Sequence, residues 1–205
     1  MRLGPIGGVL LIGACLLALV VGGIATAGGS VGIGGSDVGG LVLSAALLFG
    51  GLGVGLIGLS GSQPLDRRSL RIGLVILSVG MMSTLGSAVV SSTLAYDPLE
   101  NWSAVILFLA GGLGLLIGGI LTVIALLRSP GRPRRIGGLF VSGLLLAMVS
   151  GALVNSVFAY TSMDTPALHL AGGAIALVGG TLMLIACGAL GLLAIQSGRP
   201  GAAGS

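Results

Sequence analysis

Two long apolar runs, residues 104–127 and 136–160, are separated by eight residues that include four arginines and two prolines. Each run exceeds the roughly 18 residues that a membrane-spanning helix needs, and a segment as charged as 128–135 cannot lie in hydrocarbon. Clustered arginine beside an apolar run is typical of the cytoplasmic side of a membrane. We therefore expect both runs to cross a bilayer and to be joined on its cytoplasmic side.

The rest of the chain has the same character, with 55% hydrophobic and only 7% charged residues. A soluble domain has about 25% charged residues, so this chain could not cover a water-facing surface. No polar segment is long enough to fold alone, and residues 1–205 are predicted to form a single integral membrane domain. All nine basic residues are arginine, and their distribution indicates membrane orientation rather than nucleic-acid binding.

The sequence predicts an all-α polytopic membrane protein with six transmembrane helices. Their approximate bounds are 6–25, 40–59, 70–95, 104–127, 136–160 and 167–195. Alternating these spans places both termini and every arginine group on one side, which the positive-inside rule makes cytoplasmic. The residues that determine this topology are Arg67, Arg68, Arg71, Arg128, Arg132, Arg134 and Arg135. We expect a multi-pass protein of a bacterial plasma membrane with a short disordered cytoplasmic tail at 198–205.

The first span has an alternative interpretation as a signal peptide. Residues 1–27 contain an early arginine and an apolar run, and Ala25-Thr26-Ala27 resembles a small-x-small cleavage site. The apolar run is longer than the 7–15 residues or so that are usual in signal peptides, which favours an uncleaved helix. Cleavage would leave five spans in the same orientation.

A repeated pattern groups the spans into three hairpin units, at about 2–62, 67–130 and 131–197. The segment from Arg71 to Tyr96 aligns without gaps with the segment from Arg135 to Tyr160, and nine of the 26 positions are identical. Each hairpin is expected to enter from the cytoplasm. In its layout alone, and without a shared motif, this arrangement resembles the HdeD-type membrane proteins of bacterial acid resistance.

Glycine and other small residues are expected to pack the helices tightly, because helices in a bilayer associate through close backbone approach. Rows of small residues at four-residue spacing include Gly51–Gly55, Ala110–Gly114–Gly118 and a row that begins at Val79 on the third span. Polar residues near the outer ends of two spans form a second candidate feature. Asn155, Ser156, Ser91 and Ser92 are predicted either to make helix–helix contacts or to line an outward-facing polar pocket.

The sequence offers little chemistry for catalysis. Its one histidine, His169, cannot form a nucleophile–base–orienter set with carboxylates in loops, so we predict no enzyme, no metal and no cofactor. Cys15 and Cys187 both fall within spans, where they are interpreted as small apolar packing residues. Asp97, Glu100, Asp164 and His169 are expected to be solvated near the outer face; cation binding or pH sensing by this group stays open.

Two functions follow as expectations. The first is a non-enzymatic structural or accessory protein of the membrane, acting either in envelope stress or as a subunit of a larger complex. The alternative is a membrane component of a transporter that binds a small neutral solute near Asn155 and Ser91. The expected partners are the lipid bilayer, including anionic headgroups at the arginines, and a second copy or another membrane protein.

Overall fold

The structure is a computed structural model that describes residues 3–26, 38–60, 68–93, 98–161 and 166–197. Within these helices, side-chain surroundings are not described at 25–26, 91–93, 98–101, 147, 150–161, 166–173 and 176. The expected tail at 198–205 lies outside the described residues.

Six α-helices follow one another in the described part of the chain, as the apolar runs predict. They are α1 (Leu3–Thr26), α2 (Val38–Ser60), α3 (Arg68–Thr93), α4 (Pro98–Leu127), α5 (Arg132–Thr161) and α6 (Pro166–Ser197). Five contain a described stretch that is long and apolar enough to cross a membrane, namely all except α5. The chain is therefore a helical protein of membrane type.

All six helices begin earlier than the apolar runs indicate, and in three of them a proline lies at or next to the first residue. α4 begins at Pro98 rather than near 104, and α6 begins at Pro166. α5 begins at Arg132, so that Pro133 is its second residue. A proline fits the first turn of a helix because the N–H group it lacks would have no partner there. The expected start of α5 near residue 136 was wrong because the arginines are part of the helix.

The corner between α4 and α5 is made by residues 128–131. Arg128 N donates to Ile124 O and Ser129 N to Leu126 O, both at 3.0 Å, and the Ser129 hydroxyl donates to Ala125 O at 2.8 Å. These bonds satisfy carbonyls at the C-terminus of α4, which Pro130 cannot continue. Gly131 has a φ of 75°, a conformation that favours glycine, and it turns the chain into α5.

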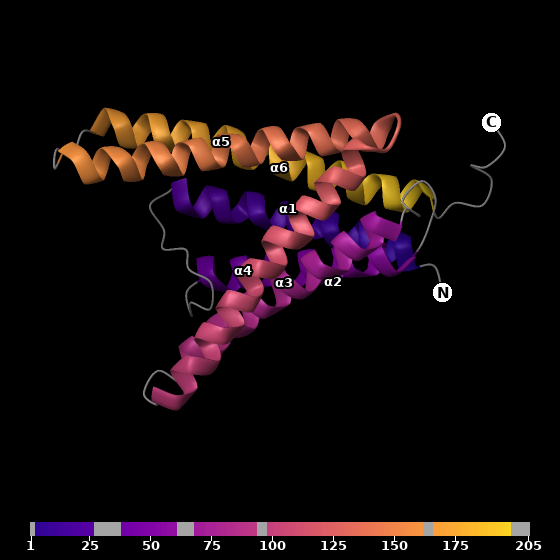
Figure 1. The fold of residues 1–205 in the computed structure, drawn as a ribbon, viewed down its shortest axis with the longest axis horizontal. Coiled ribbons are helices and arrows are strands. Elements are labelled where there is room, and N and C mark those ends of the chain that lie inside the picture. Colours follow the sequence, from indigo (N-terminus) through magenta and orange to yellow (C-terminus); the bar gives the residue numbers. More distant parts are fainter. Residues whose placement is uncertain (1–2, 27–37, 61–67, 94–97, 162–165, 198–205) are drawn as a thin grey trace.

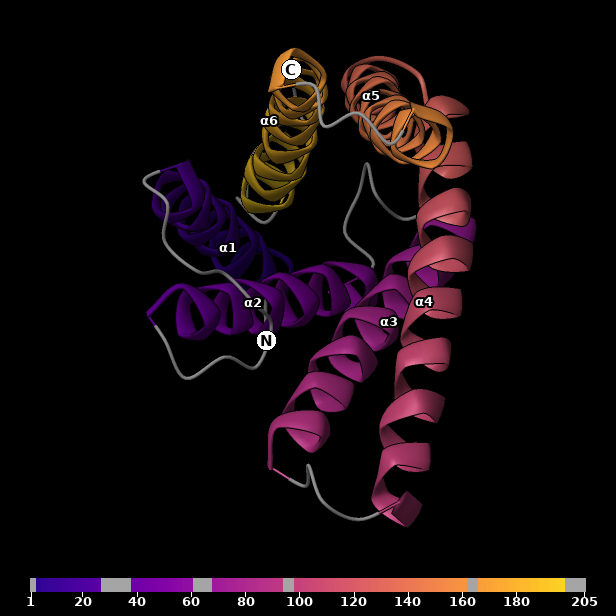
Figure 2. The same ribbon diagram turned by 90° about the vertical axis from the view of Figure 1, so that its left-hand side faces the viewer.

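The six helices form a closed ring in which each contacts its neighbours in the sequence and α6 returns to α1 (Figures 1 and 2). The three most extensive interfaces join α3 to α4, α1 to α2 and α5 to α6. The α4–α5 interface is the least extensive of those in the ring, and α4 diverges from α5 beyond the corner that joins them (Figure 1).

The buried apolar core lies toward one end of the ring, and all six helices contribute to it. Its fully buried side chains include Ile57, Leu70, Leu74 and Leu126. These residues lie in the last turns of α2 and α4 and the first turns of α3, next to the arginine-bearing segments. Large apolar side chains elsewhere are exposed, as on α4 from Trp102 to Leu127. Such a surface suits contact with lipid rather than water.

Candidate functional site

The polar residues predicted to form a pocket are located on two helices that are not neighbours in the ring. Ser91 and Ser92 belong to the last turn of α3, and Asn155 and Ser156 to the second half of α5. Their side chains lie outside the described residues, as do those of Glu100 and His169. Asp37, Arg67, Asp97 and Asp164 lie outside the described residues altogether. The predicted polar pocket therefore stays a prediction.

Glycines bring the backbones of α3 and α4 into contact over most of their length. A Cβ atom on Gly80 would lie 2.6 Å from Leu115 N, and one on Gly114 would lie 2.8 Å from Gly80 Cα. A Cβ on Gly118 would collide with the backbone of Leu77. Atoms do not approach this closely without displacement, so only glycine fits these positions of the α3–α4 seam.

The first helix makes the same kind of contact on two sides. Toward α2, a Cβ on Gly53 would lie 2.8 Å from both Gly7 O and Leu11 N. Toward α6, a Cβ on Gly191 would lie 2.9 Å from Gly8 O. Consecutive glycines Gly7 and Gly8 thus serve different interfaces, because adjacent residues on a helix face directions about 100° apart. Glycine contacts therefore close the ring between its first and last helices.

Serine hydroxyls of α3 add hydrogen bonds to both neighbouring helices. Ser78 Oγ donates to Gly51 O of α2 at 2.7 Å, and Ser87 Oγ donates to Ala104 O of α4 at 2.7 Å. The buried Thr122 hydroxyl of α4 has no hydrogen-bond partner in the described part of the chain. The contact made by Ser78 was not predicted from the sequence. The feature that could have indicated it is a small polar residue on the helix that follows the Gly51–Gly55 row.

The four-residue rows predicted from the sequence are correct on α2 and correct in part on α3 and α4, where Ser87, Gly114 and Gly118 lie at the α3–α4 seam. Gly51 and Gly55 face α3, where a Cβ on Gly55 would lie 2.7 Å from Ser78 Oγ. Val79, however, is 59% exposed, and Ala110 is exposed. The residues of α3 that meet α4 include Gly73, Leu77, Gly80, Thr84 and Ser87.

Residues that are identical in the aligned hairpins have different surroundings. Gly73 faces α4, the helix that follows it, whereas Gly137 faces Leu126 and Leu127 of α4, the helix that precedes it. Ser78 bonds to α2, whereas its aligned counterpart Ser142 is exposed. The two segments are thus not packed equivalently, and a common repeat remains an inference from the sequence.

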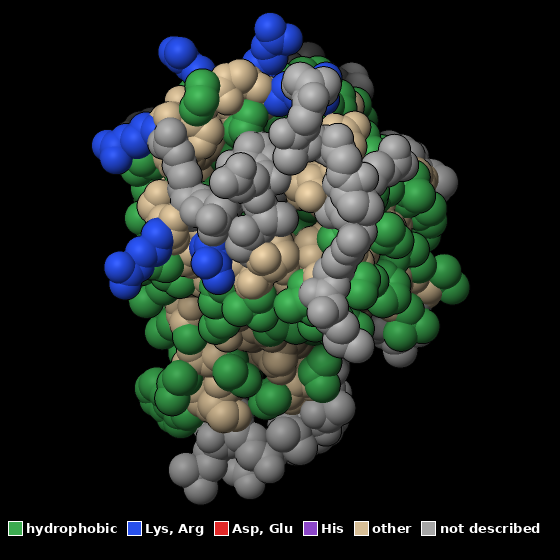
Figure 3. Space-filling model, turned by 90° about the vertical axis from the view of Figure 1, so that its right-hand side faces the viewer, with side chains coloured by type: hydrophobic (Ala, Val, Ile, Leu, Met, Phe, Trp, Pro, Cys, Tyr) green, Lys and Arg blue, Asp and Glu red, His purple; other side chains and the backbone are tan. Residues whose placement is uncertain are grey.

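The six described arginines gather at one end of the ring, where α1 begins and α6 ends (Figure 3). All of them are exposed: Arg68, Arg71, Arg128, Arg132, Arg134 and Arg135. Arg132 Nη1 donates to Gln196 Oε1 at 3.4 Å, which links the start of α5 to the last turn of α6. The shared location is the arrangement that alternating spans predict.

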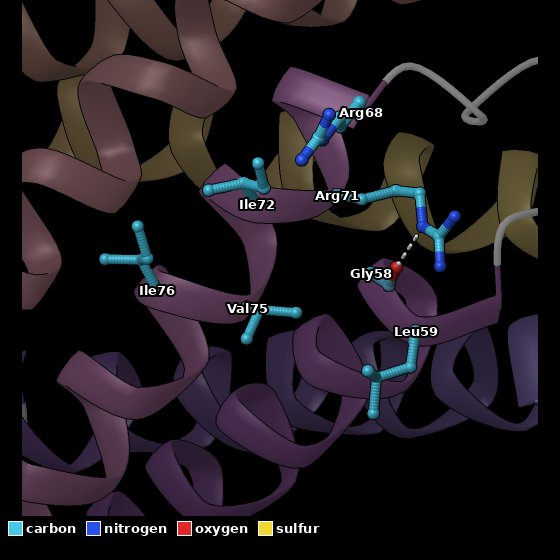
Figure 4. Close-up of a pocket in the computed structure, with 7 residues that line it drawn as sticks. All are labelled: Gly58, Leu59, Arg68, Arg71, Ile72, Val75 and Ile76. Atoms are coloured by element: carbon cyan, nitrogen blue, oxygen red, sulfur yellow. Dashed lines mark hydrogen bonds between the residues drawn. The ribbon is translucent and has the colours of Figure 1, made fainter.

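A pocket of about 510 Å³ lies at this end between α2 and α3 (Figure 4). Arg71 Nε donates to Gly58 O at 3.1 Å, a carbonyl in the last turn of α2. The remaining lining is apolar except for one further arginine, and consists of Leu59, Arg68, Ile72, Val75 and Ile76. The sequence predicts the location of these arginines but not a pocket beside them.

Cys15 of α1 and Cys187 of α6 meet across the seam that closes the ring. Their side chains interact with each other, and Cys15 Sγ donates to Leu184 O at 3.7 Å. Both thiols are free. Treating them as two separate packing residues missed their contact, because nothing in the local sequence shows that α1 lies beside α6.

No group of three or more residues that could hold a metal ion occurs in the described part of the chain. The chain matches no protein-family model, no curated protein and no solved structure.

Proposed function

We propose that this protein is a non-enzymatic, multi-pass component of a bacterial plasma membrane, with a structural, accessory or envelope-stress role. The observation that carries the proposal is the use of glycine at the helix seams. Gly7, Gly8, Gly80, Gly114 and Gly118 all bring backbones into contact. Glycines at the seams let the helices pack closely into a rigid ring. A rigid ring suits a protein that supports or connects other membrane proteins.

The arginine-bearing end is proposed to face the cytoplasm, with both termini on that side. Support comes from six exposed arginines at one end and from the general excess of arginine and lysine in cytoplasmic loops. The three hairpins are proposed to derive from one repeated unit, on the strength of the aligned sequences alone.

Native mass spectrometry of the protein, extracted gently from its own membrane, tests the accessory role. A co-purifying membrane protein or a defined homo-oligomer is the expected result. A monomer that carries a small neutral solute would contradict the proposal and favour the transport alternative. The intact mass also shows whether residues 1–27 are retained.

Asn155→Leu separates the same two functions by another route. If Asn155 makes helix contacts, the variant loses thermal stability or its assembly state changes. If Asn155 lines a solute site, the variant folds and assembles normally but loses the bound solute in the mass spectrum. Ser142→Ala, at an exposed position of the same helix, is the control and should change neither property.

A further inference from the structure

The pocket between α2 and α3 combines charge and apolar surface in a defined order. Arg68 and Arg71 stand in the first turn of α3, and Ile72, Val75 and Ile76 follow along the helix (Figure 4). We propose that this pocket binds an anionic phospholipid, with the phosphate at the arginines and an acyl chain along the apolar wall. This inference goes beyond the accessory role and does not depend on it.

The charged part of the pocket suits a phosphate group. Arg68 is exposed and makes no hydrogen bond or ion pair with the described part of the chain. Arg71 is held against α2 by its bond to Gly58 O, which fixes the position of its charge. Guanidinium groups bind phosphate through charge-assisted hydrogen bonds, which are stronger than neutral ones. Arg68 is thus the principal phosphate ligand of the proposed site.

The helix itself strengthens the positive potential at this point. The N-terminus of α3 carries partial positive charge from its unpaired N–H groups, and its first turn contains no acidic residue. Arginines at a helix N-terminus are unfavourable unless an anion lies nearby. A bound phosphate would offset the positive charge of the arginines and the partial positive charge of the helix N-terminus.

The apolar wall argues for a lipid rather than a free anion. From Arg68 to Ile76 the helix rises about 12 Å, and beyond the arginines the lining offers no polar side chain. Ile72 and Leu59 are 44% and 57% exposed, so apolar surface is available beside the charges. Contact with such a wall does not favour binding of a hydrated phosphate ion, whereas an acyl chain is stabilised there because its apolar surface is buried. The volume of about 510 Å³ also exceeds what a phosphate ion needs.

The position of the pocket fits the same ligand. The arginines lie at the end of α3 and the isoleucines toward its middle, so the change from charged to apolar runs along the helix axis. A phospholipid in the same leaflet has its phosphate and its chains in that order. Its headgroup and chain would therefore reach the two parts of the pocket together.

The test uses the full chain, purified in a neutral detergent and stripped of lipid. Dioleoylphosphatidylglycerol, dioleoylphosphatidylcholine, dihexanoylphosphatidylglycerol and sodium phosphate are added separately, and thermal unfolding and native mass spectra are recorded. Only the long-chain anionic lipid is expected to raise the Tm clearly and to form a one-to-one adduct. Arg68→Gln should weaken this binding about tenfold, because a charge-assisted hydrogen bond contributes about 1.5 kcal/mol or more.

Two variants serve as controls. Arg134→Gln removes an exposed arginine from the same end of the molecule but outside the pocket, and should leave lipid binding unchanged. Ile72→Ser changes only the apolar wall of the pocket. It should weaken binding of the long-chain lipid without changing the charge of the pocket. Unchanged elution in size-exclusion chromatography shows that each variant is folded.

Several results would overturn the proposal. Equal stabilisation by sodium phosphate would make this a free-anion site, and equal stabilisation by phosphatidylcholine would remove the role of charge. Equal loss of binding in Arg68→Gln and Arg134→Gln would show attraction by the whole arginine end rather than by a pocket. Equal binding of the dihexanoyl lipid would show that the wall takes no part.

Discussion

Gly114 and Gly112 are two residues apart on α4, but only Gly114 faces another helix. A Cβ on Gly114 would lie 2.8 Å from Gly80 Cα, whereas one on Gly112 would meet nothing within 4 Å. Gly114→Ala should destabilise the protein by about 1–3 kcal/mol, because backbone atoms would have to move apart. Gly112→Ala should leave stability unchanged or raise it by up to about 1 kcal/mol, since alanine favours helix.

Thermal unfolding in detergent, with both variants measured beside the unmodified chain, checks this prediction. Equal Tm values for Gly114→Ala and Gly112→Ala would mean that the α3–α4 seam is not packed as closely as the structure has it.

Ser78 and Ser142 are the same residue at aligned positions, and they differ in their contacts. Ser78→Ala removes the 2.7 Å hydrogen bond to Gly51 O and should cost about 0.5–1.5 kcal/mol. Ser142→Ala should have little effect because its side chain is exposed. Unfolding of the two variants by denaturant gives the comparison, and a larger loss for Ser142→Ala would contradict the α2–α3 contact.

At the scale of the helices, the departure of Val79 and Ala110 from the α3–α4 seam has a simple geometric cause. Four residues rotate a helix by about 400°, so each step of a four-residue row turns about 40° past the previous one. A row that continues at four-residue spacing therefore turns away from the contact face. The residues of α3 that meet α4 alternate steps of four and three, as in Gly73, Leu77, Gly80, Thr84 and Ser87, which keeps them on one face.

The orientation of the helices gives a prediction that labelling can check. In a background with Cys15 and Cys187 replaced by alanine, Arg134→Cys and Trp102→Cys introduce single thiols at opposite ends of the bundle. Both positions are exposed. A membrane-impermeant maleimide added to intact cells with a permeable outer membrane should label Trp102→Cys and not Arg134→Cys. The reverse pattern would invert the orientation, and labelling of both would contradict the separation of the two ends.

For the whole molecule, the sequence predicted the parts of the fold that depend on local pattern. Six apolar runs correspond to six helices, and the arginines at 68–71 and 128–135 share one end because alternating spans require it. The start of α5 was missed because apolar character alone does not show that Pro133 and three arginines belong to a first turn.

Contacts between distant segments could not be predicted from one sequence. The α1–α6 seam joins residues about 180 positions apart, such as Gly8 and Gly191, and glycine alone does not specify its partner. The pocket beside Arg68 and Arg71 arises from how the end of α2 meets the start of α3, which a linear pattern does not encode. The predicted polar group at Asn155 and Ser91 is in the part of the helices whose side chains are not described.

The central structural claim is that six helices close into a ring through the α1–α6 seam. Disulfide formation between Cys15 and Cys187 in native membranes tests it most directly, because these thiols meet only if the seam exists. Treatment with copper phenanthroline should give an intramolecular disulfide, seen as a linked peptide pair by mass spectrometry, and Cys15→Ser should abolish it. The pair Ser87→Cys with Ala104→Cys, across the α3–α4 hairpin, serves as a positive control. If that control pair links while Cys15 and Cys187 stay reduced or link only between molecules, the ring is not closed.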